Sequence, residues 1–161
     1  MTKPIINLSK IYTSYVMEIS SHWQDGKLVT RATGLVNATP EKVMSSHMSE
    51  DYANVLGIEK YTYFKRKRNH VMCSFKQKVG PLSFQMSFEK IIERYPWETK
   101  VHYKTFDSVA DMTGVWTIAP ANGRASLSLV QEINVPPALR WLPVKSVIEN
   151  KVRNAYKAYE I

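Results

Sequence analysis

Three polar side chains lie in strand-like segments where the other residues of the same face are apolar. Gln77 shares its alternating pattern with Phe75, and Gln131 shares its pattern with Leu129. Tyr103 occupies the equivalent position in the strand-like run around it. A buried amide or phenol needs a hydrogen bond, because leaving it without one costs about 1–3 kcal/mol. In a closed core these groups would bond to the backbone or to each other, whereas in an apolar pocket they would orient a ligand's carbonyl or hydroxyl group. The sequence leaves both alternatives open.

The histidines and the cysteine offer little for metal binding. They are His22, His47, His70, His102 and Cys73, and no two histidines stand four residues apart on a helix. A zinc site needs several converging nitrogen and sulfur ligands, so we expect no metal. The motifs GxSxG, HExxH and GxxxxGK[ST] are absent, which removes the commonest hydrolase, metalloprotease and P-loop signatures. We therefore assign no catalytic residue and expect no cofactor.

Four consecutive cations, Lys65, Arg66, Lys67 and Arg68, interrupt the segment YFKRKRNHV at 63–71. The chain has 22 Lys and Arg against 14 Asp and Glu, a formal charge of +8, so these four residues carry half of the excess. The strand-like runs on both sides predict the tip of a hairpin. Such a charge run is typical of a solvated turn, but it also suits contact with the headgroups of an anionic membrane. Nucleic-acid binding is disfavoured, because it usually needs a broader basic stripe or a recognisable module.

The pattern after about residue 58 predicts an antiparallel sheet. Apolar and polar residues alternate at 71–78, 82–89, 97–104, 112–118 and 125–133. This alternation is typical of strands with one wet face and one apolar face. Earlier in the chain, Asp25 and Gly26 form a strong turn pair, because glycine readily adopts positive φ. They predict an opening hairpin over 11–38.

Two helical regions are predicted. Thr39 as N-cap before Pro40 starts a short helix, and Ser49 with the two acidic residues that follow starts a second one, ending near Gly57. A long final helix opens at Pro143. Its apolar stripe consists of Val144, Ile148, Val152, Ala155 and Tyr159. This stripe needs a partner, and the apolar face of the sheet is the available one.

Length and composition favour one globular domain over 1–161, with 1–27 as an N-terminal extension or an extra hairpin strand. The chain is 44% hydrophobic and 22% charged, enough to bury a substantial core. Its one cysteine, Cys73, fits a reducing compartment. No segment resembles a secretory signal or approaches the roughly 18 apolar residues of a membrane span. We expect a soluble, cytoplasmic protein.

The order of strand, two short helices, antiparallel strands and one long C-terminal helix resembles the START-like (SRPBCC) superfamily. The matching segments are VNATPEKVMSSHMSEDYANVLG, MTGVWTIAPANGRASLSLVQEINVPP and VIENKVRNAYKAY, and the resemblance covers 28–161 in order. It implies an α+β helix-grip fold, in which a curved antiparallel sheet wraps around the last helix. It also implies an elongated apolar cavity between them. Members include lipid-transfer proteins, polyketide cyclases and coenzyme-Q-binding proteins.

We therefore expect the chain to bind, sequester or transfer a hydrophobic small molecule such as a lipid, quinone or polyketide, with the loop near 55–57 as a gate. The alternatives are a cyclase or dehydratase, in which Tyr103 and a histidine move protons, and an interaction protein that uses the basic tip. The predicted cavity-lining residues are Met44, Met48, Phe75, Gln77, Phe84, Met86, Phe88, Tyr103, Trp116, Leu127, Leu129, Gln131, Ile148 and Val152.

Overall fold

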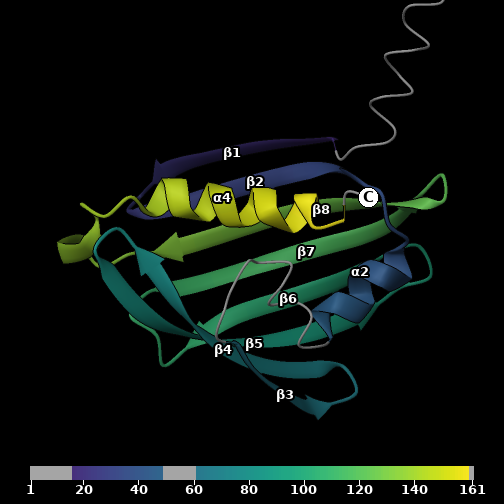
Figure 1. Ribbon diagram of the computed structural model, residues 1–161, viewed down its shortest axis with the longest axis horizontal. Coiled ribbons are helices and arrows are strands. Elements are labelled where there is room, and N and C mark those ends of the chain that lie inside the picture. Colours follow the sequence, from purple (N-terminus) through teal and green to yellow (C-terminus); the bar gives the residue numbers. More distant parts are fainter. Residues whose placement is uncertain (1–15, 49–60, 160–161) are drawn as a thin grey trace, which may run out of the picture.

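The computed structural model describes residues 16–48 and 61–159, and its main element is one curved antiparallel sheet (Figure 1). The described strands follow the spatial order β1-β2-β8-β7-β6-β5-β4-β3. They are β1 Val16–Gln24, β2 Lys27–Val36, β3 Tyr61–Lys67, β4 His70–Val79, β5 Leu82–Arg94, β6 Thr99–Phe106, β7 Asp111–Ala121 and β8 Arg124–Asn134. The strands from β3 to β8 follow one another as hairpins, and β8 returns to pair with β2.

Tight turns with positive φ join several of these strands. Asp25 and Gly26 have φ of 51° and 79° and connect β1 to β2, which confirms the predicted opening hairpin. Asn122 and Gly123, with φ of 51° and 77°, connect β7 to β8 in the same way. Asn, Asp and Gly tolerate this left-handed conformation better than other residues. β1 is an edge strand, so the described part of 1–27 adds one strand beside β2.

In the described part of the chain, two α-helices and one short 3₁₀ helix accompany the sheet. The helix α2 spans Pro40–His47, and the Thr39 side chain accepts a hydrogen bond from the Lys42 N–H at 3.2 Å, as expected of an N-cap. The 3₁₀ helix η1 spans Pro137–Leu139, and α4 spans Val144–Lys157. The predicted second short helix and the gate near 55–57 lie outside the described residues.

The C-terminal helix α4 lies along the concave face of the sheet, which gives the helix-grip arrangement (Figure 1). The predicted stripe of Val144, Ile148, Val152, Ala155 and Tyr159 is buried, as is Tyr156. The Tyr156 hydroxyl donates to the Leu127 carbonyl at 2.8 Å and so joins the helix to β8. Within 16–48 and 61–159, no helix combines the length and apolar character needed to cross a membrane.

The concave face carries two core clusters. The first cluster packs under α2 and the last turns of α4, and includes Val43, Trp116 and Leu127. The second packs around η1 and the first turns of α4, and includes Phe88 and Ile133. α2 and the end of α4 therefore cover one half of the concave face, and η1 and the start of α4 cover the other half.

Candidate functional site

A cavity lies between the concave face of the sheet and α4. It has about 150 Å³ of water-accessible space, and because one water needs roughly 10–15 Å³ by this measure, it has room for about ten waters. Its described lining is Cys73, Phe75, Gln77, Val79, Phe84, Met86, Phe88, Lys90, Tyr103, Val109, Ala110, Met112, Trp116, Leu129, Gln131, Ile133, Val135, Pro136, Leu139, Leu142, Val144, Val147, Ile148, Lys151, Val152 and Ala155. This lining is apolar apart from a few polar groups, as is typical of small-molecule sites.

The predicted lining residues divide between the cavity and the packed core. The residues found in the cavity wall are Phe75, Gln77, Phe84, Met86, Phe88, Tyr103, Trp116, Leu129, Gln131, Ile148 and Val152. Met44, Met48 and Leu127 lie instead in or against the first core cluster. Their side chains face inward as the pattern indicates, but α2 and the end of α4 fill that half of the face.

A row of aligned residues crosses the concave face between the two core clusters. We call it the polar row, and it consists of Lys90 on β5, Tyr103 on β6, Gly114 on β7, Gln131 on β8, Thr30 on β2 and Ser21 on β1. On β5 the second cluster contributes Phe88 on one side of the row, and the first contributes Ile92 on the other. The polar row therefore marks the boundary between the two clusters. Most of the cavity lining lies on the side of the second cluster, and Trp116, Leu129, Val152 and Ala155 of the first cluster also line it.

Gly114 allows two members of the polar row to meet across an intervening strand. The Tyr103 ring lies over Gly114, so that a Cβ at position 114 would be only 2.8 Å from Tyr103 Cε1 and closer still to Cζ and the hydroxyl. In this position the Tyr103 hydroxyl donates a hydrogen bond to Oε1 of Gln131. Burial raises the pKa of Tyr103 well above its usual value, so the phenol keeps its proton.

Lys90 and Lys151 line the cavity, and the sequence analysis predicted neither of them as a lining residue. The Lys90 side chain is buried on the inner face of β5, 4% exposed, beside Tyr103 in the cross-strand register. Burial lowers the pKa of Lys90 to about 8, and the nearby Cys73 opposes this shift. His47 on α2 is buried too, and burial, followed by the charge of Lys90, holds its pKa well below the ordinary value. His47 is therefore neutral near pH 7, whereas Lys90 is still mostly charged.

The cavity wall becomes apolar away from the polar row. Phe88 contacts Tyr103 edge-on, with ring centroids 6.0 Å apart, and stacks on Phe75 at 5.4 Å. Further along β5 the wall reaches Phe84, which is about 20 Å from Lys90 along the strand. Gln77 faces Phe84 from β4, and its amide donates to the Lys78 carbonyl at 2.8 Å. Gln77 therefore lies at the opposite end of the cavity from Tyr103 and Gln131.

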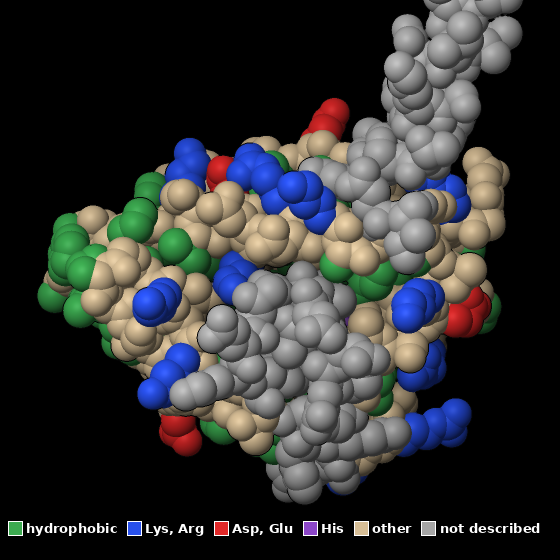
Figure 2. Space-filling view, viewed as in Figure 1, with side chains coloured by type: hydrophobic (Ala, Val, Ile, Leu, Met, Phe, Trp, Pro, Cys, Tyr) green, Lys and Arg blue, Asp and Glu red, His purple; other side chains and the backbone are tan. Residues whose placement is uncertain are grey.

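The end of the cavity beside η1 is rich in exposed apolar side chains. Val109 in the β6–β7 loop lines the cavity and is 43% exposed, and Trp141 after η1 is 66% exposed. Figure 2 shows hydrophobic side chains gathered at the end of the molecule that carries η1. The turn at Gly80 packs against Pro143 at the start of α4, so the β4–β5 hairpin belongs to the same end. We refer to this end as the mouth.

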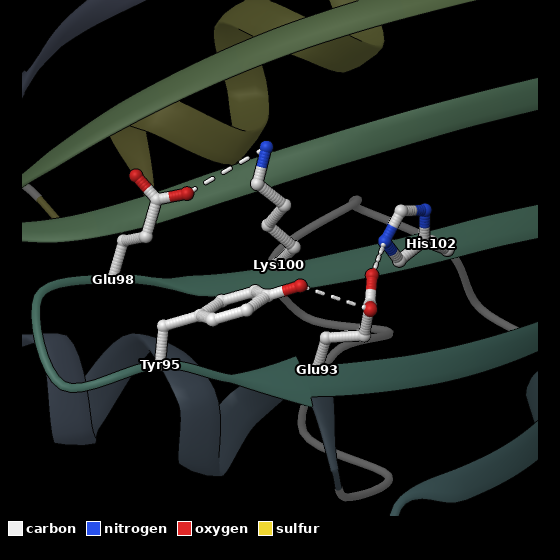
Figure 3. A network of polar contacts seen from close by, with 5 residues as sticks. All are labelled: Glu93, Tyr95, Glu98, Lys100 and His102. Carbon is white, nitrogen blue, oxygen red and sulfur yellow. Dashed lines mark hydrogen bonds and ion pairs between the residues drawn. The ribbon is translucent and has the colours of Figure 1, made fainter.

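The strand histidines lie away from the cavity. His102 contacts Glu93 on the outer face, where Glu93 also accepts a hydrogen bond from the Tyr95 hydroxyl at 3.1 Å (Figure 3). These hydrogen bonds, Tyr95 first, lower the pKa of Glu93. His70 Nε2 lies 3.3 Å from a Glu89 oxygen on the same outer face. Among the described residues, no group of three or more His, Cys, Asp or Glu side chains could hold a metal ion.

The basic segment lies at the tip of the β3–β4 hairpin, as predicted: Lys65, Arg66 and Lys67 end β3, and Arg68 lies in the turn. β3 and β4 pair across it, and Lys67 and Arg68 are exposed there. The mouth is at the other end of β4, which spans roughly 30 Å from His70 to Val79. The basic tip and the mouth are therefore separate surfaces.

No family model and no curated protein matches the chain, but many solved structures do. The human StarD13 lipid transfer and protein localization domain is 12% identical, with 97% of this chain and 98% of that one covered and a TM-score of 0.65. The chain has a START-like helix-grip fold. A STAR-related lipid transfer protein from Xanthomonas axonopodis gives 10% identity, coverage of 89% and 93%, and a TM-score of 0.72. The Zhui aromatase/cyclase from a Streptomyces species gives 12% identity, coverage of 90% and 92%, and a TM-score of 0.61.

These likenesses concern the fold, and the START-like arrangement explains the position of the cavity. The sheet curves around α4, so the hollow half of its concave face is enclosed by side chains from both. In this chain Lys90, Tyr103 and Gln131 of the polar row line one part of the hollow, and the side chains at the mouth are apolar. Alternation in the sequence could have revealed Lys90, because Lys90 is two residues from both Phe88 and Ile92.

Proposed function

We propose that this START-like protein binds and carries a hydrophobic small molecule, of the lipid, quinone or polyketide class, in the cavity beside α4. The observation that supports the proposal is the cavity itself, large enough for about ten waters and almost wholly apolar. Burial of apolar surface, at roughly 25 cal/mol per Å², would supply most of the affinity. The lipid-transfer neighbours are consistent with this function. We further propose a cytoplasmic carrier, in line with its single cysteine.

Native mass spectrometry of the purified protein, followed by organic extraction, tests this proposal. We expect an apolar passenger in stoichiometric amount, or uptake of added lipid by the empty protein. The matched variants are Ala110→Phe, which places a ring in the cavity, and Ala119→Phe, which places one on the outward-facing side of β7. Loss of binding only in Ala110→Phe would support the cavity as the site. A protein that takes up no lipid or quinone would refute the proposal.

A cyclase or dehydratase is the alternative function, and the Zhui aromatase/cyclase is a structural neighbour of that kind. Such an enzyme would need a histidine facing the cavity beside Tyr103. His47 is the nearest candidate, but it packs against Trp116, with ring centroids 6.3 Å apart, and is not part of the lining. An enzyme of this kind would need His47 to leave Trp116 and enter the cavity, whereas a carrier needs no such rearrangement.

Contact of the basic tip with an anionic membrane is a separate proposal. Lys67 and Arg68 are exposed at the β3–β4 connection and would gain roughly 1 kcal/mol each near an anionic surface. Because the mouth is at the other end of β4, the basic tip could hold the protein at a membrane surface without contacting the ligand in the cavity.

A further inference from the structure

The hydrogen-bonding groups at the inner end of the cavity are mainly donors. Lys90 is cationic and lines the cavity there. Since Oε1 of Gln131 accepts the Tyr103 proton, its NH₂ group is the part of the amide that can donate to a ligand. No Asp or Glu occurs in the described lining, whose charged members are Lys90 and Lys151. A ligand group that suits this end is an acceptor, and preferably an anion.

The cavity also has a direction. Lys90, Tyr103 and Gln131 belong to the polar row, and beyond this row the described lining includes only Trp116, Leu129, Val152 and Ala155 of the first core cluster. From the polar row towards the mouth, the β5 wall changes from Lys90 to Phe88, Met86 and Phe84. An amphipathic molecule would therefore place its polar head at the inner end and its apolar tail towards the mouth.

From this arrangement we propose that the cavity binds a long-chain carboxylate head first, with Lys90 as the anchor of the carboxylate and Gln131 as a second donor. The inference rests on the proposed carrier function and names its ligand class. A carboxylate suits the site because it accepts several hydrogen bonds at once, and both the Lys90 ammonium and the Gln131 NH₂ group are donors. Burial holds the pKa of Lys90 near 8, so at pH 7 the amine is mostly in the charged form that such a partner requires.

Lys151 provides the matched control. It also lines the cavity, from α4, but it is only part-buried, and burial lowers its pKa. Because Lys151 is partly in water, an ion pair between Lys151 and a ligand should be weaker than one between Lys90 and the same ligand. Lys90→Met and Lys151→Met remove the same charge, keep similar volume and differ in position.

The test measures the binding of dodecanoate, methyl dodecanoate and dodecanol to the full chain at pH 7 by calorimetry. The expected result is that wild type prefers dodecanoate to both neutral compounds by about 10-fold or more, as a charge-assisted hydrogen bond would give. Lys90→Met should lose this preference while it keeps its affinity for dodecanol. Lys151→Met and Lys90→Arg should keep the preference.

The outcomes separate the inference from the proposed function. If wild type binds neutral and anionic chains equally well, or if Lys90→Met keeps the preference, the head-first carboxylate is refuted and the carrier stands. Loss of the preference in Lys151→Met with retention in Lys90→Met would refute Lys90 as the anchor. If the protein binds none of the three compounds and no other lipid or quinone, the carrier function itself is refuted. Lys90→Arg keeps the test valid if Lys90→Met does not fold.

Discussion

Gly114 provides a direct test of the polar row. In most strands, replacing glycine by alanine stabilises a protein by roughly 0.5–1 kcal/mol, because glycine has more freedom to lose on folding. Here we expect the opposite. A Cβ at position 114 would be 2.8 Å from Cε1 of Tyr103, and nearer to Cζ and the hydroxyl, so the ring has to move.

The size of the effect follows from what the displaced ring gives up. Moving it breaks the hydrogen bond from Tyr103 to Gln131, and Gln131 is only 6% exposed. A buried acceptor left without its partner costs about 1–3 kcal/mol, and forcing extra volume into a packed site costs about 1–3 kcal/mol. After the usual gain from replacing glycine, Gly114→Ala should reduce the free energy of unfolding by about 2–4 kcal/mol.

The measurement is urea unfolding of wild type, Gly114→Ala, Tyr103→Leu and the double variant. Tyr103→Leu removes the ring that lies over Gly114, so in that background Gly114→Ala should be neutral or slightly stabilising. The interaction free energy of this cycle should be about 2–4 kcal/mol. A Gly114→Ala substitution that costs less than about 0.5 kcal/mol, or costs the same in both backgrounds, would refute the reasoning.

Three further predictions concern other parts of the molecule. Burial depresses the pKa of Lys90 to about 8, so between about pH 8 and 10.5 the unfolded chain binds more protons than the folded one, and stability should rise with pH. In urea unfolding, the free energy of unfolding of wild type should rise by about 2–3 kcal/mol relative to Lys90→Met between pH 7 and 10. A difference between the two proteins that does not change with pH would contradict this. Tyr156→Phe removes the hydrogen bond to the Leu127 carbonyl and should cost about 1–3 kcal/mol by the same assay, whereas no loss would mean that the hydroxyl is not needed to join α4 to β8. Replacing Lys67 and Arg68 by Gln should weaken sedimentation with phosphatidylserine vesicles and leave lipid uptake unchanged, and equal sedimentation of both proteins would exclude the basic tip as the contact.

Local rules accounted for much of the fold. The Asp25-Gly26 turn and the Thr39 cap were predictable because each depends on residues close in sequence. The predicted strand beyond Tyr95, in contrast, begins only at Thr99, and Trp97 is 64% exposed. The alternation of apolar and polar residues begins two residues before the strand does, because Trp97 is an exposed aromatic residue in the turn and matches the pattern by its type alone.

The candidate site was only partly predictable. Alternation has a period of two, so it indicated that Gln77, Tyr103 and Gln131 face inward. It could not indicate that Tyr103 and Gln131 bond to each other while Gln77 lies near the other end, because that depends on pairing between strands distant in sequence. Lys90 was missed because a lysine is almost never fully buried, and the predicted alternation in this strand ended at residue 89.

The sequence by itself therefore determined which side chains face the interior and where the chain turns, because these properties depend on neighbours a few residues away. Only the tertiary structure decided which part of the interior is filled and which is hollow. Met44 and Leu127 face inward like Phe75 and Met86, yet α2 and the end of α4 pack against the first pair, while the second pair lines open space. That difference depends on the curvature of the sheet and on how α4 lies across it, and these are set by contacts between segments far apart in the chain.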